Sequence, residues 1–427
     1  MATNQITSLT TLAKVGRQVH KGVLKGFARR SETWKLWKQL KEFDLNASQR
    51  TVTATIDITE NGSGAFIEEF GAEANAKTAA PQDLTFAWAS YNDRYSFSKT
   101  SEYLDKKFRD GQLVRQAKYQ TMKMIEGLTK RVGMAFYGVS TGIICETSTN
   151  ATSAGPADYA LANGFSQASI DDTTYLASLF SAGDYVALVR SAALVTNAIG
   201  LVNSVAVATG LNITWAGSVD ADAADSIVFA NQKTAATSQT LALATEYNKA
   251  PFGLTEMATA TSLHGLSGST YPKWASYGDT TGGDLTGTRL KRGQHEIKNK
   301  IGGDADLLIM AQGVSRRLYQ TTSSAVHFND PLGMEILGSV KTGSIKQHDM
   351  DPLCPPGWAF LMDKSFFYKW SLVDIPSEDA GAIDNMDNAN IDKLQDVNGS
   401  VVSFDLPFQN ITKGRGALSY WTGLTEA

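Results

Sequence analysis

The spacing of hydrophobic and polar positions changes several times along the chain, and each change predicts a different element. Residues 51–58 alternate between polar and apolar side chains, as a strand does, and a second alternation follows at Leu84, Phe86 and Trp88. Gly and Ser residues at 61–64 separate the two runs. The pattern predicts a long hairpin from about Thr51 to Lys99, which needs a surface to lie on because a lone hairpin is marginal in water.

Between about Gln112 and Gly138 the apolar residues recur every three or four positions, which predicts one long helix. Leu128 and Val132 lie on the apolar face of this pattern. At a rise of 1.5 Å per residue the helix is about 40 Å long. It is long enough to act as the spine of a flat domain.

After the predicted helix, the pattern changes to short strands separated by turn residues, from about Asp184 to Ala230. These strands predict a small β-barrel or sandwich, inserted at residues 158–250. A helix at 287–300, a buried strand at 305–310 and a second helix at 314–319 indicate an α+β domain. Strands at 358–362, 366–370 and 401–406 follow, with an acidic loop at 378–396.

Charge is distributed unevenly along the chain of 427 residues, whose formal net charge is −4. The first fifty residues contain ten Lys and Arg against three Asp and Glu, a net of +7 that leaves −11 for the remainder. The arm is also amphipathic, because its basic side chains recur opposite a row of valines: Lys14, Arg17, Lys21 and Lys25. Such an arm is expected to contact a polyanion such as DNA, or acidic loops of a neighbouring copy, and we favour the neighbour; a solvated charged face is the plainer alternative.

The search for catalytic motifs argues against an enzyme. No GxxxxGK[ST] run is present, the segment Gly265–Ser269 departs from GxSxG by one position, and His295-Glu296 is followed by Asn299 where a second zinc ligand would stand. We therefore expect no cofactor and no metal site. Cys145 and Cys354 lack CxxC spacing and are expected to be buried thiols in a reducing cytoplasm.

Two acidic clusters leave a weaker alternative open. Asp220, Asp222 and Asp225 offer hard oxygen ligands, but the glycine and the distant glutamate of a calcium loop are absent. A second group, at 384–392, has five oxygen-bearing side chains within nine residues. Exposed turn carboxylates are the better interpretation of both. No apolar run approaches the roughly 18 to 20 residues that span a bilayer, so no membrane partner is expected.

The order of these parts, together with two short motifs, resembles a known family. Residues 264–274, with Gly265, Tyr271, Pro272 and Trp274, resemble the Gly-Leu and Tyr-Pro-x-Trp turn of Hong Kong 97-type (HK97-like) major capsid proteins of tailed bacteriophages. Residues 302–309 resemble the strand of the A-domain in that family. The resemblance implies six parts: an N-terminal arm (1–48), an E-loop hairpin (49–100), a P-domain with the spine helix (101–157), an inserted β-rich domain (158–250), an A-domain (251–375) and C-terminal strands (376–427).

The resemblance also implies a function. A chain of this family assembles with itself, as hexamers and pentamers, into an icosahedral virion capsid in the host bacterial cytoplasm. Its other expected partners are portal protein, a scaffolding or decoration protein, and nonspecifically bound double-stranded DNA. The inserted segment is longer than the minimal fold needs, so its role stays open.

Candidate assembly residues lie in the arm and the hairpin. Ile56, Ile58, Phe86 and Trp88 stand on an excursion that is expected to be too thin to bury them, so a neighbouring copy is expected to cover them. Some family members place a crosslinking lysine near the hairpin tip, where this chain has Lys77; an ordinary surface lysine is the stronger interpretation.

Two other classes of protein remain as alternatives. An encapsulin, a bacterial cargo shell of the same fold, is one, although encapsulins resemble a shorter chain without the insert. The other is an extracellular β-rich adhesin or fibre protein, suggested by the strands rich in Thr, Ser and Gly. The long predicted helix argues against the adhesin.

Overall fold

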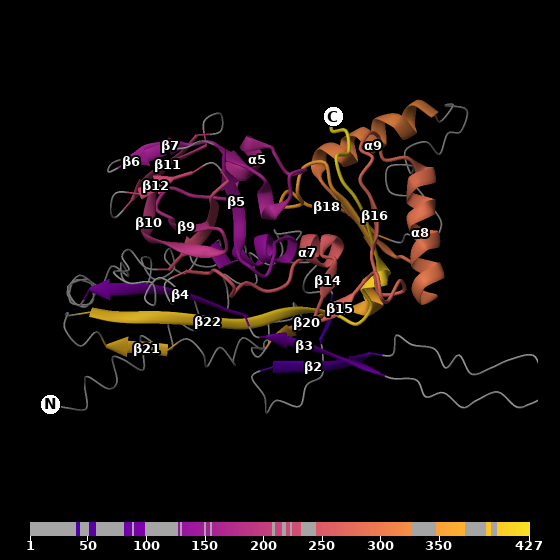
Figure 1. Ribbon diagram of the computed structural model, residues 1–427, viewed down its shortest axis with the longest axis horizontal. Coiled ribbons are helices and arrows are strands. Elements are labelled where there is room, and N and C mark those ends of the chain that lie inside the picture. Colours follow the sequence, from indigo (N-terminus) through magenta and orange to yellow (C-terminus); the bar gives the residue numbers. More distant parts are fainter. Residues whose placement is uncertain are drawn as a thin grey trace, which may run out of the picture.

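The computed structural model describes fifteen segments, and all structural statements refer to these: 40–42, 51–56, 81–87, 89–98, 127–128, 130–148, 151–153, 156–206, 210–215, 219–222, 224–231, 245–325, 347–371, 390–393 and 399–427. They form a mixed α+β structure. Figure 1 shows two lobes side by side above a long, flat sheet. Of the described helices, none has both the length and the apolar character needed to cross a bilayer.

The first lobe, called here the seven-stranded lobe, comprises residues 143–230. Its sheet has the order β7-β11-β10-β9-β13-β5-β8. The central strand β9 runs through Val186–Val189, which are all buried because the strand has neighbours on both edges and side chains on both faces. The strands are β5 (Ile143–Thr147), β7 (Ala157–Tyr159), β8 (Leu161–Ala162), β9 (Tyr185–Arg190), β10 (Ala193–Ala206), β11 (Gly210–Trp215) and β13 (Ser226–Ala230).

This lobe also contains a pair of short strands, β6 (Ala151–Ser153) with β12 (Val219–Ala221), the turn η1 (Gly164–Ser166) and the helix α5 (Thr173–Ser178). Asp172 caps α5 by accepting hydrogen bonds from the amides of Thr174 and Tyr175. The strands predicted from 184 onward are present. The sheet also takes β5 and the start of β7 from before residue 158, where the sequence pattern places the beginning of the insert.

The second lobe, called here the α/β lobe, has a five-stranded sheet in the order β16-β23-β19-β17-β18. Its strands are β16 (Tyr277–Asp279), β17 (Leu307–Met310), β18 (Gln347–Met350), β19 (Ala359–Met362) and β23 (Leu418–Trp421). Two helices, α8 (Gly287–Ile301) and α9 (Gln312–Ala325), flank it. Thr286 caps the start of α8, and Gly302 ends it at φ +71°, a conformation that glycine adopts without strain. The helix, strand and helix predicted at 287–319 are confirmed.

The flat sheet beneath the lobes, called here the body sheet, joins segments that lie far apart in the sequence. Its order is β1-β20-β22-β21, and β4 also pairs with β22. The strands are β1 (Lys41–Glu42), β4 (Ala89–Ser98), β20 (Phe367–Ser371), β21 (Asn390–Lys393) and β22 (Gly399–Thr412). β4 runs antiparallel to β22 from Ala89, opposite Phe408, to Ser98, opposite Gly399. β4 is therefore part of the body, and the hairpin itself ends at Ala87.

The hairpin consists of β2 (Thr51–Ile56) and β3 (Gln82–Ala87), which form a separate two-stranded sheet. Of the long helix predicted at 112–138, residues 127–137 are described apart from 129, and they are helical. Leu128 and Val132 are buried there, as the pattern predicts. The remaining described elements are α7 (Leu254–Thr259), β14 (Ser262–Leu263), β15 (Leu266–Ser267), η3 (Lys364–Phe366) and η5 (Arg415–Ala417).

Candidate functional site

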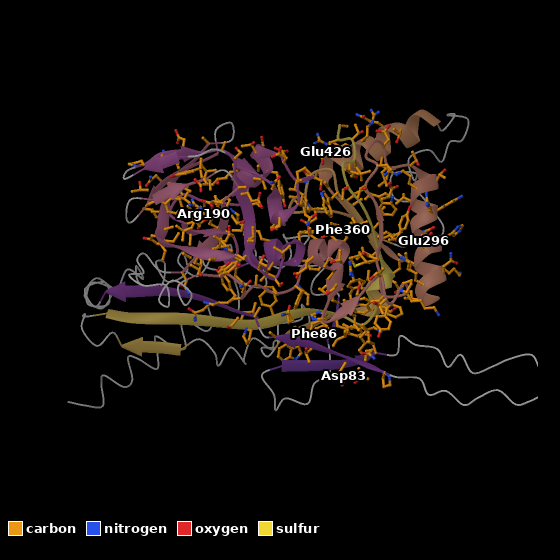
Figure 2. The ribbon with its side chains drawn as sticks, viewed as in Figure 1. Asp83, Phe86, Arg190, Glu296, Phe360 and Glu426 are labelled. Atoms are coloured by element: carbon orange, nitrogen blue, oxygen red, sulfur yellow. The ribbon has the colours of Figure 1, made fainter. Side chains whose placement is uncertain are left out.

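The base of the hairpin packs against the body of the same chain. Leu84 and Phe86 on β3 are fully buried, and Ile56 on β2 is 7% exposed. Figure 2 shows Phe86 directed toward the body and Asp83 directed away from it. The expectation that a neighbouring copy must cover Ile56 and Phe86 is therefore wrong, because both are buried within the single chain, where Phe252 and His264 contact the ring of Phe86.

His264 is one of the residues that hold the base of the hairpin. Its ring lies 4.0 Å from that of Phe86 and 4.5 Å from that of Phe252, centroid to centroid. Burial lowers the pKa of His264 to about 4, and a hydrogen bond with the Thr85 backbone opposes this only in part. The imidazole is thus neutral near pH 7, and it joins β3 to the turn between β14 and β15.

The motif that carries the family resemblance forms that turn and the bend after it. His264 and Gly265 connect β14 to β15 with φ of +53° and +79°. The amide of Tyr271 donates to Ser267 O (3.0 Å), and the amide of Trp274 donates to Tyr271 O (2.9 Å). Trp274 is buried whereas Pro272 is exposed, so the motif anchors one aromatic ring in the core.

The same segment contains the near-match to a serine-hydrolase motif. The hydroxyls of Ser267 and Ser269 lie 2.8 Å apart and bond to each other. Neither has a histidine or a carboxylate as a hydrogen-bond partner in the described part of the chain. This geometry provides no base to activate a nucleophile.

Gln409 on β22 is a site residue that the sequence pattern did not indicate. Its side chain is buried; Nε2 donates to Ala87 O (2.6 Å), and Oε1 accepts from the amide of Phe252 (2.8 Å). The adjacent Asn410 donates from Nδ2 to Phe252 O (2.7 Å). These bonds fix the point at which the hairpin leaves the body. A Gln-Asn pair in the apolar run 406–411 is the signal that could have indicated it.

Arg415 is a second polar residue that the sequence pattern missed. It is 3% exposed and donates from Nε to Met257 O and from Nη2 to Ala258 O (3.1 Å). These carbonyls belong to the last turn of α7, where a cation is favourable. Burial lowers the pKa of Arg415. The residue ties the C-terminal segment to α7 in the core.

A buried junction joins the helix, the seven-stranded lobe and the α/β lobe. Tyr137 Oη donates to Asp351 (2.8 Å), and Tyr175 Oη donates to Leu353 O (2.8 Å). Burial raises the pKa of both phenols well above the usual value. Cys354 lies beside them, and burial likewise raises the pKa of its thiol. Both cysteines are buried and free, as expected, and neither is a thiolate near pH 7.

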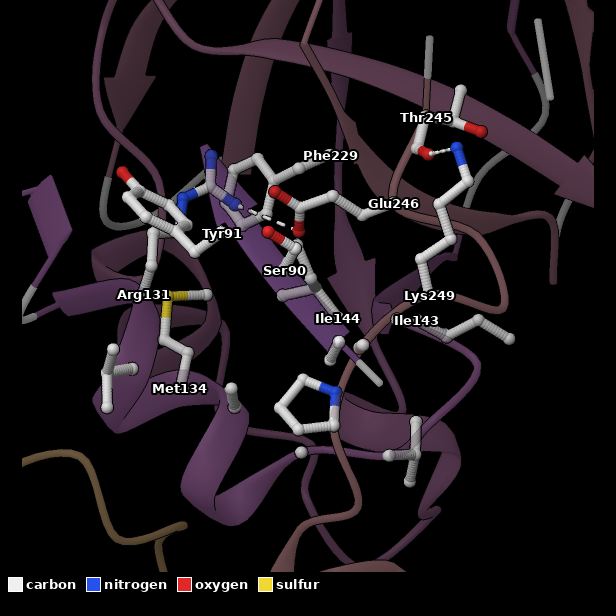
Figure 3. Close-up of a pocket in the computed structure, with 18 of the residues that line it drawn as sticks. Ser90, Tyr91, Arg131, Met134, Ile143, Ile144, Phe229, Thr245, Glu246 and Lys249 are labelled. Carbon is white, nitrogen blue, oxygen red and sulfur yellow. Dashed lines mark hydrogen bonds and ion pairs between the residues drawn. The ribbon is translucent and has the colours of Figure 1, made fainter. Parts of the chain in front are cut away.

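A cavity of about 160 Å³ lies between the helix at 127–137, the seven-stranded lobe and β4. Figure 3 shows Arg131 at its edge, with the guanidinium 2.8 Å from the ring centroid of Phe229 and 3.6 Å from Glu246. Its walls are largely apolar, and Lys249 Nζ donates to Thr245 O (2.9 Å). A cavity of this size has room for several water molecules.

Of the candidate cation ligands, Asp222 and Asp225 form ion pairs with an arginine. Arg190 makes a bidentate ion pair with Asp225 (2.8 and 2.7 Å) and also contacts Asp222 (3.0 Å). No group of three or more His, Cys, Asp or Glu in the described segments is arranged to hold a metal ion. The acidic residues at 384–388 lie outside the described residues.

Several candidate assembly residues lie outside the described residues as well, so the expectations about them stay predictions. They are Lys14, Arg17, Lys21, Lys25, Ile58, Lys77 and Trp88.

Comparisons with known proteins give matches among solved structures. No family model and no curated protein matches the sequence. The chain is similar to a subunit of the cyanophage A-1(L) capsid, with 12% identity, a TM-score of 0.48 and coverage of 92% of this chain and 93% of that one. It is also similar to the procapsid of satellite phage P4 (9% identity, 98% and 91% covered, TM-score 0.40).

The holo-SrpI encapsulin of Synechococcus elongatus matches as well, with 7% identity, 92% and 88% of the chains covered, and a TM-score of 0.39. The three matched structures are described as a capsid, a procapsid and an encapsulin complex. Because their identities are at most 12% and their TM-scores are below 0.5, we base the proposed function on the residues and geometry of this chain.

Proposed function

We propose that this chain is the major capsid protein of a tailed-phage-type particle, which assembles with copies of itself into a closed icosahedral shell. The observation that supports this best is the hairpin β2–β3. Its base is fixed to the body through Phe86, His264 and Gln409, yet its two strands pair with no other described strand.

An anchored two-stranded ribbon of this kind fits contact between copies. Both outer edges of β2 and β3 leave backbone groups unpaired by described strands, and such edges readily accept a partner. The outward side chains Thr55, Asp83 and Thr85 are exposed, and Thr55 Oγ1 donates to Asp83 (2.7 Å). The buried face belongs to the chain itself. The exposed face and the edges are what a neighbouring copy contacts in this proposal.

Repetition makes such contacts strong. In a closed shell every copy both gives and receives a hairpin, so a modest contact is multiplied over the whole assembly. The basic arm adds a second contact, with acidic loops of a neighbour. Portal protein, a scaffolding or decoration protein and packaged DNA are the further partners in this proposal, and assembly takes place in the host cytoplasm.

Removal of the hairpin tip tests the proposal. Residues 61–79, which lie outside the described segments, are replaced by a short Gly-Ser turn while the anchored base is kept. We expect a folded subunit with an unchanged thermal unfolding temperature and a marked loss of shells in sedimentation and electron microscopy. Shells as abundant and as heat-resistant as those of the unmodified chain would contradict the proposal, and an insoluble variant would place the segment in the core.

The content of purified shells separates the capsid from the encapsulin alternative. DNA and phage proteins are expected in shells made in the native host. A co-purified enzyme inside them would favour a cargo shell instead.

A further inference from the structure

The helix α8 presents an exposed basic face whose function the shell proposal does not explain. It carries five Lys and Arg residues against one acidic residue, Glu296. Two of the five serve the fold: Arg289 pairs with Asp279 (2.9 Å), and Lys300 Nζ donates to Ala275 O (2.8 Å). The other three are exposed: Lys291, Arg292 and Lys298.

These cations form a stripe because of their spacing. Lys291, His295 and Lys298 follow one another at four and three residues, so they lie on one side of the helix, opposite the buried Leu290 and Ile297. Lys291 has no ion-pair partner among the described residues. Lys298 pairs with Asp304, but both side chains are more than 60% exposed, so that pair contributes little. The stripe is therefore available to an anionic partner.

Arg292 lies beside the stripe and is also available. Its guanidinium stands over the ring of Tyr277, with 5.6 Å from Cζ to the ring centroid. A cation over a ring at an exposed site gains only about 0.5–1 kcal/mol from that contact, and Arg292 is exposed.

The seven-stranded lobe carries the opposite charge. Residues 143–230 contain eight Asp and Glu and a single basic residue, Arg190, a net of −7. Arg190 is occupied by Asp222 and Asp225. Exposed carboxylates remain on the lobe at Asp158 and Asp171.

The basic helix and the acidic lobe lie apart within one chain. Figure 1 shows the seven-stranded lobe and α8 on opposite sides of the sheet of the α/β lobe. A molecule with a basic surface on one part and an acidic surface on another can associate head to tail. Head-to-tail contacts close into rings when the rotation between copies allows it.

We propose that the basic face of α8 (Lys291, Arg292, His295 and Lys298) docks on the acidic surface of the seven-stranded lobe of a second copy, forming an electrostatic contact around each ring of subunits. The inference rests on the proposed shell function and names the role of the lobe within it. A nucleic acid is the other anion that a basic helix face could bind. The second copy is favoured because each chain carries both surfaces, so every basic face in a ring has one acidic partner.

Charge reversal tests the contact. The variant Lys291→Glu/Arg292→Glu reverses the charge of one exposed lysine and of one arginine that stands over a tyrosine ring. The matched control, Arg316→Glu/Lys413→Glu, reverses the same number of charges outside α8. Arg316 is exposed on α9, and Lys413 stands over the ring of Tyr368 (5.1 Å from Nζ to the centroid). We expect the first variant to raise the subunit concentration needed for assembly by about tenfold or more, because the lost pair recurs at each contact. The control is expected to assemble as the unmodified chain does.

A charge swap identifies the partner surface. Adding Asp158→Lys and Asp171→Lys to the α8 variant is expected to restore assembly, and salt is expected to weaken the unmodified contact, since screening acts over about 10 Å at 0.1 M. Assembly of the α8 variant equal to that of the control, or a failure of the swap to restore it, overturns the inference. So does a variant that assembles normally but no longer retains DNA fragments in a mobility-shift assay. If the unmodified chain forms no shells under any condition, it is the proposed function that fails.

Discussion

His264 occupies a left-handed backbone conformation that few residues with a side chain adopt. This conformation places its imidazole in contact with two aromatic rings. Its φ of +53° turns the ring into the gap between Phe86 and Phe252. Nε2 is buried there without a hydrogen-bond partner. A charged imidazole would be poorly solvated in this position, so the attachment of the hairpin depends on the neutral ring.

This attachment predicts a pH dependence. The folded-state pKa of His264 is depressed from 6.5 to about 4, so the unfolded chain takes up a proton first as the pH falls. The stabilisation is complete above about pH 6.5 and is lost as the pH falls toward 4, by roughly 3 kcal/mol. Urea unfolding across this range measures it. His264→Phe, which keeps an aromatic ring, should reduce this pH dependence by that amount.

Thr288→Ala, at an exposed position of α8 without a titratable group, supplies the control and should keep the pH dependence of the unmodified chain. A His264→Phe variant with an unchanged dependence on pH would show that another group is responsible.

At the residue scale, the sequence indicated which residues matter better than it indicated what they contact. Trp274 and Gly265 were singled out by a motif, and both belong to the turn at the hairpin base. Phe86 was singled out as well, but its partner is in the same chain, since sequence spacing does not show which distant loop will cover a strand. Gln409 and Arg415 bond to backbone groups about 150 to 320 residues away, a distance over which no local pattern carries information.

At the scale of elements, the position of α8 against the sheet depends on one close contact between the helix and strand β23. Gly293 lies against the ring of Trp421 on β23, and an added Cβ there would stand 2.7 Å from that ring. Trp421 is fully buried, so the ring has no room to move. The absence of a side chain at this position lets the helix approach the sheet.

Gly293→Ala should therefore destabilise the protein, although alanine favours a helix by about 0.5–1 kcal/mol. Overpacking of this kind costs about 1–3 kcal/mol, which exceeds the gain. We expect a lower thermal unfolding temperature. Thr288→Ala, at an exposed position of the same helix, should leave it equal or slightly higher. A stabilised Gly293→Ala variant would mean that α8 shifts away from the sheet without cost.

Elements whose partners are near in sequence were predicted well. The segment 287–319 was expected as helix, strand and helix, and it forms α8, β17 and α9. These elements were predictable because the repeat of their apolar residues is strong within each short segment. The place of β4 was not predicted, because its alternation fits a hairpin strand as well as a body strand, and only the pairing with β22 decides between them.

At the scale of the whole molecule, the seven-stranded lobe is the part whose contacts are most local. All seven strands of its sheet lie within residues 143–230. From the insert predicted at 158–250, a fragment of residues 165–245 would be expected to fold alone. That fragment lacks β5, β7 and β8, and with β7 it loses Tyr159, which accepts a buried hydrogen bond from Trp215 Nε1 (2.7 Å).

We expect residues 143–230 expressed alone to unfold cooperatively on heating and residues 165–245 to be unfolded. The fragment that begins at residue 143 includes the strands at both ends of the sheet. It also includes Tyr159, the hydrogen-bond partner of Trp215. Thermal unfolding followed by circular dichroism compares the two fragments. A cooperative transition in 165–245 would show that β5, β7 and β8 are dispensable for this lobe.

The pairing of β4 with β22 has a consequence for synthesis on the ribosome. β4 emerges early, but its partner begins about 300 residues later, at Gly399. Until then β4 has an open edge, and open edges in nascent chains invite aggregation. The seven-stranded lobe can form meanwhile from contiguous sequence, whereas the body sheet must close last and slowly. We therefore expect nascent chains of this protein to depend on chaperones that shield a strand edge until translation is nearly finished.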